Sequence, residues 1–221
     1  MTTTCRSIAT GTVYGTLFNH LSLSALLGDA VNRSPYQGAP KAPVLFIKPR
    51  NTFAGSGDPV VIPDGVPELE AAASLGIVIA RAACKLSPAT AMDHVVGFLI
   101  VNDVSVPHTS YHRPSIRYKA RDGFCPMSRA VVPAREVANP DALEMRTYID
   151  GVLVQSTNTV QMLRSSRQLL VDVTDFMTLY AGDVLCLGSA APAPRIRPGQ
   201  TVTIEIEQVG RLSNAFIRES T

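Results

Sequence analysis

The most constraining feature of the sequence is a series of short runs rich in Val, Ile, Leu and Phe, separated by Pro and Gly. Sixteen Pro and fifteen Gly occur along 221 residues, so long uninterrupted helices are few. Apolar runs of this length are typical of β-strands. Asp150-Gly151 lies between two of them and favours the positive φ angles of a tight hairpin turn. The pattern predicts a mainly β protein, with strands at 44–48, 75–79, 95–104, 144–149, 152–155, 184–187 and 202–207.

Two segments interrupt the β pattern and are expected to be helical. The first begins at Ser87-Pro88, where Ser suits a helix N-cap and Pro suits the first turn, and should end near Asp93 or His94. The second extends from about residue 159 to 179, because apolar side chains recur there at helical spacing, with a break expected around 172–174. Its apolar face should pack on a sheet.

Length and composition favour one compact domain. A chain of 221 residues that is 46% hydrophobic and only 17% charged can bury a sizeable core and lies within the size range of single domains. We therefore expect residues 1–221 to form a single domain, in which residues 1–42 lead into the β structure.

Charge and hydropathy exclude several classes of partner. The formal net charge of +2 comes from scattered Lys and Arg residues, so no basic surface for nucleic acid is predicted. The most apolar run, at 95–101, is too short to cross a bilayer, and the first residues do not resemble a secretory signal. The four Cys are far apart, which is typical of reduced thiols. We expect a cytoplasmic protein that binds small molecules or other proteins.

Four separated segments together resemble the fumarylacetoacetate hydrolase (FAH) superfamily. They are FIKPRNT at 46–52, GFLIVNDV at 97–104, RYKARDGFCP at 117–126 and TLYAGD at 178–183. Their order and spacing match the family along nearly the whole chain. The resemblance implies a mixed β-sandwich roll with a few short helices packed on its outside, and dimerisation through the sheet region.

Three stretches resemble one branch of this superfamily more narrowly. Residues 34–36, 48–52 and 111–114 are similar to the amino-terminal half of the bifunctional isomerase/decarboxylases of 4-hydroxyphenylacetate (homoprotocatechuate) degradation. Some organisms make that half as a separate subunit. The resemblance implies decarboxylation of 5-oxopent-3-ene-1,2,5-tricarboxylate and isomerisation of 2-hydroxyhepta-2,4-diene-1,7-dioate in aromatic-acid catabolism. The substrate would be a small oxo-dicarboxylate or oxo-tricarboxylate, and the assembly a homodimer or a heteromer with a related metal-bearing subunit.

The family binds Mg²⁺ or Mn²⁺ through a Glu-x-Glu pair on one strand and an Asp at the end of the next. Asp103 matches that Asp, but the resemblance aligns Ala72 and Ser74 with the two Glu. Alternation along a strand would place both positions on one face. We therefore expect a degenerate site that binds the cation weakly or not at all. Glu68-x-Glu70 has the same spacing, but it lies roughly 13 Å upstream along the strand and is interpreted as an exposed acidic turn.

Lys119 is the first candidate for catalysis. It matches a family Lys that faces the substrate, where its charge would stabilise negative charge on an oxo-acid or enolate. Asp103 is expected to face the same site. Substrate carboxylates would be bound by hydroxyl, amide and guanidinium groups, for which the candidates are Ser189, Gln155, Arg113 and Arg50.

Two further patterns bear on the chemistry. His108 and His112 are four residues apart, but the Pro residues around them favour a loop over a helical metal site. Some relatives with a closing lid activate water with a His and a Glu near an Asn-Tyr motif. The corresponding positions here are Leu23 and Leu26, which disfavours carbon–carbon hydrolysis.

Two other functions remain open. The missing Glu pair also fits a non-catalytic chain that dimerises with a metal-bearing paralogue and supports its activity. An acylpyruvate-type hydrolase of the same superfamily is the third hypothesis, although it would lack both the Glu pair and the water-activating pair. A neighbouring gene for a similar chain with an intact Glu-x-Glu would favour the partner role.

Overall fold

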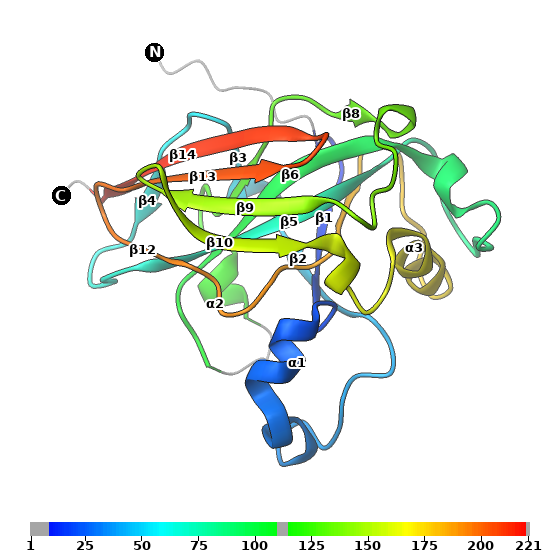
Figure 1. The fold of residues 1–221 in the computed structure, drawn as a ribbon, viewed down its shortest axis with the longest axis horizontal. Helices are drawn as coiled ribbons and strands as arrows, with labels where there is room; N and C mark the ends of the chain where they lie inside the picture. The colour runs from blue at the N-terminus through cyan, green and yellow to red at the C-terminus, as the bar shows by residue number, and fades with distance from the viewer. Residues whose placement is uncertain (1–8, 110–114, 220–221) are drawn as a thin grey trace.

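The computed structural model describes residues 9–109 and 115–219, and its strands form two sheets (Figure 1). The strands are β1 (Val13–Leu17), β2 (Val44–Lys48), β3 (Phe53–Gly55), β4 (Val60–Ile62), β5 (Leu69–Ile79), β6 (Val95–Ser105), β7 (Cys125–Met127), β8 (Val132–Pro133), β9 (Glu144–Ile149), β10 (Val152–Asn158), β11 (Val184–Cys186), β12 (Arg195–Ile196), β13 (Thr201–Ile206) and β14 (Gly210–Arg218). The larger sheet has the order β2-β1-β11-β5-β6-β7-β3, with β12 beside β5 and β8 beside β6. The smaller sheet has the order β10-β9-β13-β14-β4. The prediction of a mainly β fold is confirmed.

The helices in the described ranges are short. The α-helices are α1 (Leu21–Leu27), α2 (Ile116–Lys119) and α3 (Ser166–Thr174). Single turns of 3-10 helix occur at η1 (Gly28–Asn32), η2 (Arg50–Thr52), η3 (Ala91–His94), η4 (Ala134–Glu136) and η5 (Thr159–Gln161). Helix α1 projects away from the sheets, whereas α3 lies beside them (Figure 1). None of the helices in these ranges has the length and apolar character needed to cross a lipid bilayer.

The larger sheet curls into a roll. Its two end strands, β2 and β3, follow one another in the chain and are joined through the single turn η2, so the ends of the sheet must approach each other. A small apolar cluster fills the inner side, including Val13, Val78, Leu99, Val101 and Met127. The larger core lies between the two sheets, where β9, β13 and β14 pack over β5 and β6 (Figure 1).

Strands β5 and β6 form the centre of the roll and position the candidate site. Both strands are almost entirely buried, because one face meets the smaller sheet and the other faces the inside of the roll. Strand β6 ends on Asn102-Asp103-Val104-Ser105, which carries polar side chains beyond its long apolar run. By alternation, Asp103 and Ser105 face the inside of the roll, whereas Val104 packs in the core between the sheets.

The predicted strands all overlap strands of the structure. The hairpin between β9 and β10 is also confirmed, since Asp150 has φ 50° and Gly151 has φ 82°. Two positive φ angles in succession are the geometry of a type I′ turn, which matches the right-handed twist of the flanking strands. Asp150 also accepts from the backbone N–H of Thr201 at 2.8 Å, which ties the turn to β13.

The first helix prediction was wrong, because Ser87-Pro88 opens a turn and only Ala91–His94 is helical, as a 3-10 turn. The second was too long. Leu163 and Arg164 donate their backbone N–H groups to the backbone and side-chain oxygens of Asn19 at 2.8 and 2.9 Å, so the chain bends there and is not helical. Ser165 then starts α3 as its N-cap.

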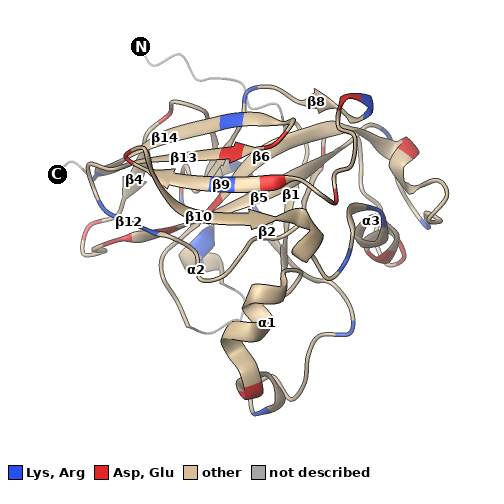
Figure 2. Cartoon of the chain, in the orientation of Figure 1, with Lys and Arg blue, Asp and Glu red and all other residues tan. Residues whose placement is uncertain are grey.

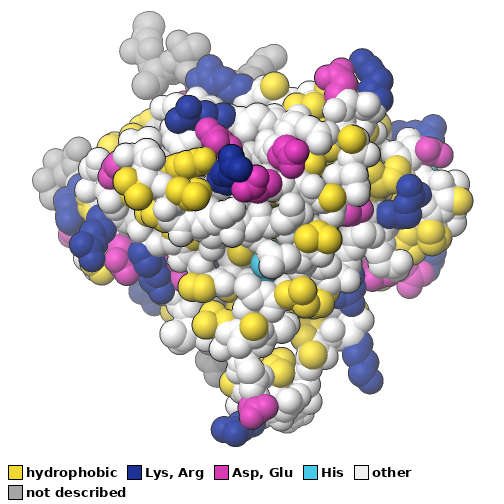
Figure 3. All heavy atoms as spheres, in the orientation of Figure 1, with side chains coloured by type: hydrophobic (Ala, Val, Ile, Leu, Met, Phe, Trp, Pro, Cys, Tyr) yellow, Lys and Arg dark blue, Asp and Glu magenta, His cyan; other side chains and the backbone are white. Residues whose placement is uncertain are grey.

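Positive and negative side chains are interspersed over the ribbon and on the face drawn as spheres (Figures 2 and 3). The drawn face shows no broad region of one sign, which agrees with the scattered charge of the sequence. The lobe that contains α1 carries apolar side chains on the same face (Figure 3), and Leu21 and Leu26 are exposed there.

Candidate active site

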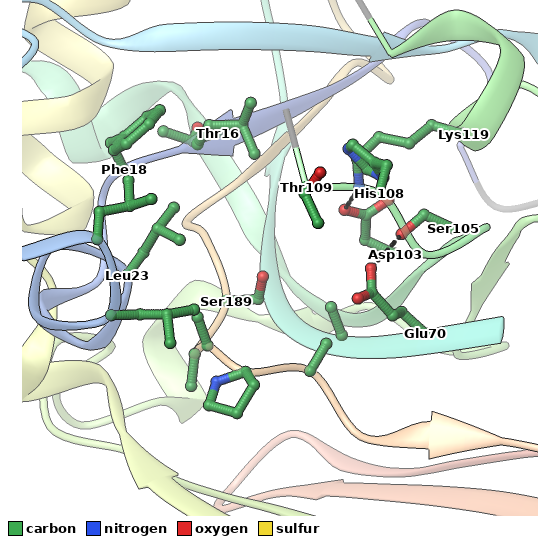
Figure 4. A pocket seen from close by; sticks show the side chains of 18 of the residues that line it. Thr16, Phe18, Leu23, Glu70, Asp103, Ser105, His108, Thr109, Lys119 and Ser189 are labelled. Atoms are coloured by element: carbon green, nitrogen blue, oxygen red, sulfur yellow. Dashed lines mark hydrogen bonds and ion pairs between the residues drawn. The ribbon is translucent and has the colours of Figure 1, made fainter. Parts of the chain in front are cut away.

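A cavity of about 270 Å³ opens at the mouth of the roll, between β5, β6, α1 and the loop that precedes β12 (Figure 4). One wall is polar and the other is apolar. The polar wall includes Glu70, Asp103, Ser105, Lys119 and Arg195, whereas Leu17, Phe18, Leu23 and Leu26 belong to the apolar wall. A ligand that fits this cavity must therefore have charged groups and a hydrocarbon portion.

The polar wall is built by the antiparallel register of β5 and β6. Ala72 pairs with Asp103, and Glu70 pairs with Ser105. Since alternate residues of a strand share a face, these four side chains project to the same side of the sheet, toward the cavity. The register also places Ser74 on this face, as the alternation predicts, but Ser74 is buried deeper in the roll.

Asp103 lies between two lysine ammonium groups. Lys119 Nζ is 2.5 Å from Asp103 Oδ2, and Lys48 Nζ is 2.7 Å from Asp103 Oδ1. All three side chains are almost completely buried. Lys119, at the end of α2, also lies 4.6 Å above the ring of Phe46. The arrangement joins one carboxylate with two cations at the inner end of the cavity.

Lys48 is held from the opposite side by backbone oxygens. Its Nζ donates to the carbonyls of Val104, Lys119 and Phe124 at 2.7, 3.1 and 2.8 Å. These three bonds satisfy the protons of an ammonium group that water does not reach. Lys48 belongs to one of the family's segments but was not predicted as a site residue. Its position at the end of the apolar run of β2 could have indicated a buried Lys.

Burial and neighbouring charges shift the pKa values of Asp103 and Lys48 in opposite directions. Burial alone would raise the pKa of Asp103, but the positive charges of Lys119 and Lys48 outweigh it and hold that pKa below its usual value. Burial lowers the pKa of Lys48, and the neighbouring Asp103 opposes that change. Asp103 is therefore ionised at neutral pH. Two lysines around one carboxylate favour the entry of a further anion.

Glu68 and Glu70 do not form an exposed acidic turn, so that expectation was wrong. Strand β5 begins at Leu69, and Glu70 lies within it with a side chain that is only 15% exposed. Ser105 Oγ donates to Glu70 at 3.2 Å. Arg195 forms ion pairs with Glu70 at 3.2 Å and with Glu68 at 3.6 Å. Pairing between β12 and β5 keeps this acidic pair folded against the sheet.

The sequence profile described as "Fumarylacetoacetate (FAA) hydrolase C-terminal" matches residues 12–217, which is most of the chain. The chain belongs to this family. Among curated members, the Escherichia coli 4-hydroxyphenylacetate degradation bifunctional isomerase/decarboxylase is 35% identical over 209 residues. That match covers 95% of this chain and 48% of the relative, in its amino-terminal half. The chain thus spans about half the length of that relative.

Solved structures agree with the assignment to the FAH family. The 5-carboxymethyl-2-hydroxymuconate delta-isomerase of Mycobacterium smegmatis has a TM-score of 0.82 and 28% identity, covering 96% of this chain and 81% of that one. The 2-hydroxyhepta-2,4-diene-1,7-dioate isomerase of Mycobacterium marinum has a TM-score of 0.81 and 28% identity, covering 96% and 77%. The FAH-type roll is therefore shown for this chain, with relatives that are isomerases and decarboxylases.

The residues at the family's expected metal position do not fit a divalent cation. Ala72 offers a methyl group directly opposite Asp103. Ser74 Oγ donates to the carbonyl of Gly188 at 2.9 Å and accepts from its N–H at 3.2 Å, so it is occupied within the protein. The oxygens of Asp103 face ammonium groups, and the described residues contain no cluster of three potential metal ligands. Mg²⁺ or Mn²⁺ would lack most of the oxygen ligands that it requires here.

The other residues chosen from the sequence lie in different places. Ser189 lines the cavity. Gln155 donates to the carbonyl of Pro192 at 2.9 Å and so fastens the loop that forms one rim of the cavity. Arg50 is exposed on η2 and is not one of the lining residues. Arg113 lies outside the described residues. The functional roles of all four stay predictions.

Two further features of the cavity lining bear on the chemistry. Leu23 and Leu26, on α1, line the apolar wall, so the positions that carry a water-activating pair in some relatives are hydrocarbon here. His108 also lines the cavity, and its ring stacks on that of Tyr118 with centroids 4.9 Å apart. His112, its proposed metal partner in the alternative interpretation, lies outside the described residues.

Proposed function

We propose that this chain is a subunit of a 5-oxopent-3-ene-1,2,5-tricarboxylate decarboxylase and 2-hydroxyhepta-2,4-diene-1,7-dioate isomerase of 4-hydroxyphenylacetate catabolism, with a degenerate metal site. The observation that carries the proposal is the placement of Asp103 between Lys119 and Lys48 at the inner end of the cavity. The identity to the bifunctional relative over nearly the whole chain supports the choice of reaction. The proposal treats residues 1–221 as one cytoplasmic domain.

The charges of the site suit a reaction that passes through an enolate. In the isomerisation, the ionised carboxylate of Asp103 lines the cavity and accepts the enol proton of the substrate. Lys119 stabilises the negative oxygen until a proton is returned to the distal carbon of the diene. In the decarboxylation, the bond to the departing carboxylate breaks, CO₂ leaves, and the electron pair is taken up as an enolate beside Lys119.

The apolar wall supports these reactions over hydrolysis. Leu23 and Leu26 cover the substrate side of the cavity with hydrocarbon and provide no group that could deprotonate water. A dry wall also strengthens the electrostatic effect of Lys119 on the enolate. An acylpyruvate-type hydrolase would need a water-activating group, so we place it behind the isomerase/decarboxylase proposal.

Lys119→Ala tests the proposal directly. Conversion of 2-hydroxyhepta-2,4-diene-1,7-dioate by the purified chain is followed by ultraviolet absorbance in the presence of a chelator. We expect the substitution to lower kcat by roughly 10²–10³-fold, as for loss of one group that stabilises an oxyanion. Lys85→Ala is the matched control, because Lys85 is 68% exposed in a surface ion pair with Asp175. Equal rates for Lys119→Ala and Lys85→Ala would refute the role of Lys119.

The second candidate is a non-catalytic partner of a metal-bearing paralogue, as a heteromer. Ala72, which faces Asp103 where a ligand is expected, is the observation that favours it. The same assay separates the two functions. Turnover by the chain alone, as a homodimer, supports the enzyme. Turnover that appears only when the chain is mixed with a related subunit that carries the Glu pair supports the partner role.

A further inference from the structure

Arg195 stands out among the charged residues of the cavity that the proposed chemistry does not use. It lies on the short strand β12, lines the cavity, and has a side chain that is 47% exposed. Lys119, by contrast, is 7% exposed and pairs with Asp103. Among the described lining residues, one cation therefore lies deep in the cavity and another lies at its rim.

The strand ladder sets the separation between the backbone positions from which these two charges extend. Arg195 pairs with Glu70 on one side of β5, whereas Asp103, the partner of Lys119, pairs with Ala72 on the other side, two residues further along. The two positions are therefore offset by about 7 Å along the strands and by two strand spacings, roughly 10 Å, across the sheet. Two long cationic side chains that reach into the cavity from such positions suit the two ends of a dicarboxylate several carbons long.

The guanidinium of Arg195 is held loosely. Its ion pairs with Glu70 and Glu68 are 3.2 and 3.6 Å long, whereas charge-assisted hydrogen bonds are usually about 2.7–2.9 Å. The planar guanidinium of Arg195 can therefore leave Glu70 and form a closer, bidentate contact with a carboxylate of a ligand. Glu70 keeps a partner after such an exchange, because Ser105 Oγ donates to its other oxygen.

We propose that Arg195 exchanges its ion pair with Glu70 for the distal carboxylate of the substrate, so that the site selects oxo-dicarboxylates over oxo-monocarboxylates. This inference rests on the proposed function, since it assigns the oxo-acid end of the substrate to Lys119. The apolar wall around Leu23 and Leu26 then contacts the carbon chain between the two carboxylates. Arg195 acts as a specificity residue and takes no part in proton transfer.

Two ligands of equal chain length test the assignment. The first is 2-oxopimelate, and the second is 2-oxoheptanoate, which differs only in lacking the distal carboxylate. Calorimetry of the full chain measures their affinities for the unmodified protein and for Arg195→Gln. We expect the substitution to weaken 2-oxopimelate about 10- to 100-fold, as for loss of a charge-assisted hydrogen bond, and to leave 2-oxoheptanoate nearly unchanged.

Arg197→Gln is the matched control. Arg197 lies two residues away, is 77% exposed, reaches only Glu68 at 3.8 Å, and is not a lining residue of the cavity. We expect it to change neither affinity. Glu70→Gln should strengthen 2-oxopimelate binding, because it removes the protein carboxylate that competes for the guanidinium of Arg195. Arg195→Lys should recover only part of the lost affinity, since a lysine cannot form a bidentate contact.

The outcomes separate this inference from the function on which it rests. If the unmodified chain binds 2-oxoheptanoate but Arg195→Gln weakens both ligands equally or neither, the distal-carboxylate role is wrong and the oxo-acid site stands. If the unmodified chain binds neither ligand, both proposals are wrong. Unchanged melting temperatures of the variants show that a loss of affinity is not a loss of folding.

Discussion

Replacing Asp103 with Asn should reveal how strongly the buried ion pairs hold the roll together. The two side chains have nearly the same shape, so the change removes a charge without opening a cavity. Lys48 would keep its three carbonyl acceptors, but Lys119 would lose a carboxylate oxygen at 2.5 Å, and the two ammonium groups would face each other without a counter-charge. Breaking a buried pair in this way costs about 3–5 kcal/mol.

For a domain of this size, each kcal/mol corresponds to about 2–4 °C in melting temperature, so we expect a fall of about 6–20 °C at pH 7. Differential scanning calorimetry measures it. Asp175→Asn is the control, since Asp175 forms an ion pair of 2.8 Å with Lys85 but is 74% exposed. Exposed pairs contribute little, so this variant should melt within about 2 °C of the unmodified chain.

The effect of pH on stability follows from the direction in which the pKa of Asp103 is shifted. The pKa of Asp103 lies below its usual value, so the ionised carboxylate stabilises the folded state above the unfolded pKa of about 3.9. That stabilisation is lost as the pH falls through the folded-state pKa. The difference between the unmodified chain and Asp103→Asn should therefore be full at pH 7 and shrink below about pH 4. A difference under 2 °C at pH 7 would refute an ionised, stabilising Asp103.

Two further predictions concern metal and protons. Ala72→Glu together with Ser74→Glu should lower the melting temperature in chelator, because the added carboxylates repel Asp103. Mn²⁺ should restore the melting temperature of this variant and leave that of the unmodified chain unchanged. Burial lowers the pKa of His20, whose ring contacts the hydroxyls of Ser22 and Thr157 at 2.7 and 2.9 Å. The unfolded state therefore binds more protons below about pH 6.5, and His20→Gln should flatten the decline of melting temperature between pH 7 and 5. Identical declines would contradict that role.

The long strands that were predicted have apolar interiors, whereas two strands that were missed, β14 and β1, bury polar side chains. Asn214 of β14 has a residue type that favours the surface, but it is only 2% exposed. Its amide donates to the carbonyls of Gly55 and Asp58 at 2.8 Å each, so a distant loop supplies the partners that make burial possible. Strand β1 was missed for a similar reason, because buried Thr16 donates to the carbonyl of Cys186.

The residues of the candidate site that could be predicted are those that belong to the family's sequence motifs. Asp103, Lys119 and Ser189, which the resemblance to the FAH family named, all line the cavity, and their roles stay predictions. Glu70 and Arg195 were not predicted as site residues, because their position depends on pairing between β5 and β12, which are more than a hundred residues apart in the chain. Residue type favours exposure for both, and in Glu70 the sheet register overrides it, since that side chain is only 15% exposed.

Under the proposed function, the charges around Asp103 explain how a site without the family's Glu pair can still bind an anion. The family's Glu-x-Glu pair contributes two negative charges and its divalent cation contributes two positive ones, so removing all three leaves the net charge unchanged. Ala72 and Ser74 remove the carboxylates, and Lys119 and Lys48 then neutralise Asp103 directly, with one positive charge in excess. Under the proposed function, the surplus positive charge of Lys119 and Lys48 over Asp103 balances one carboxylate of the substrate.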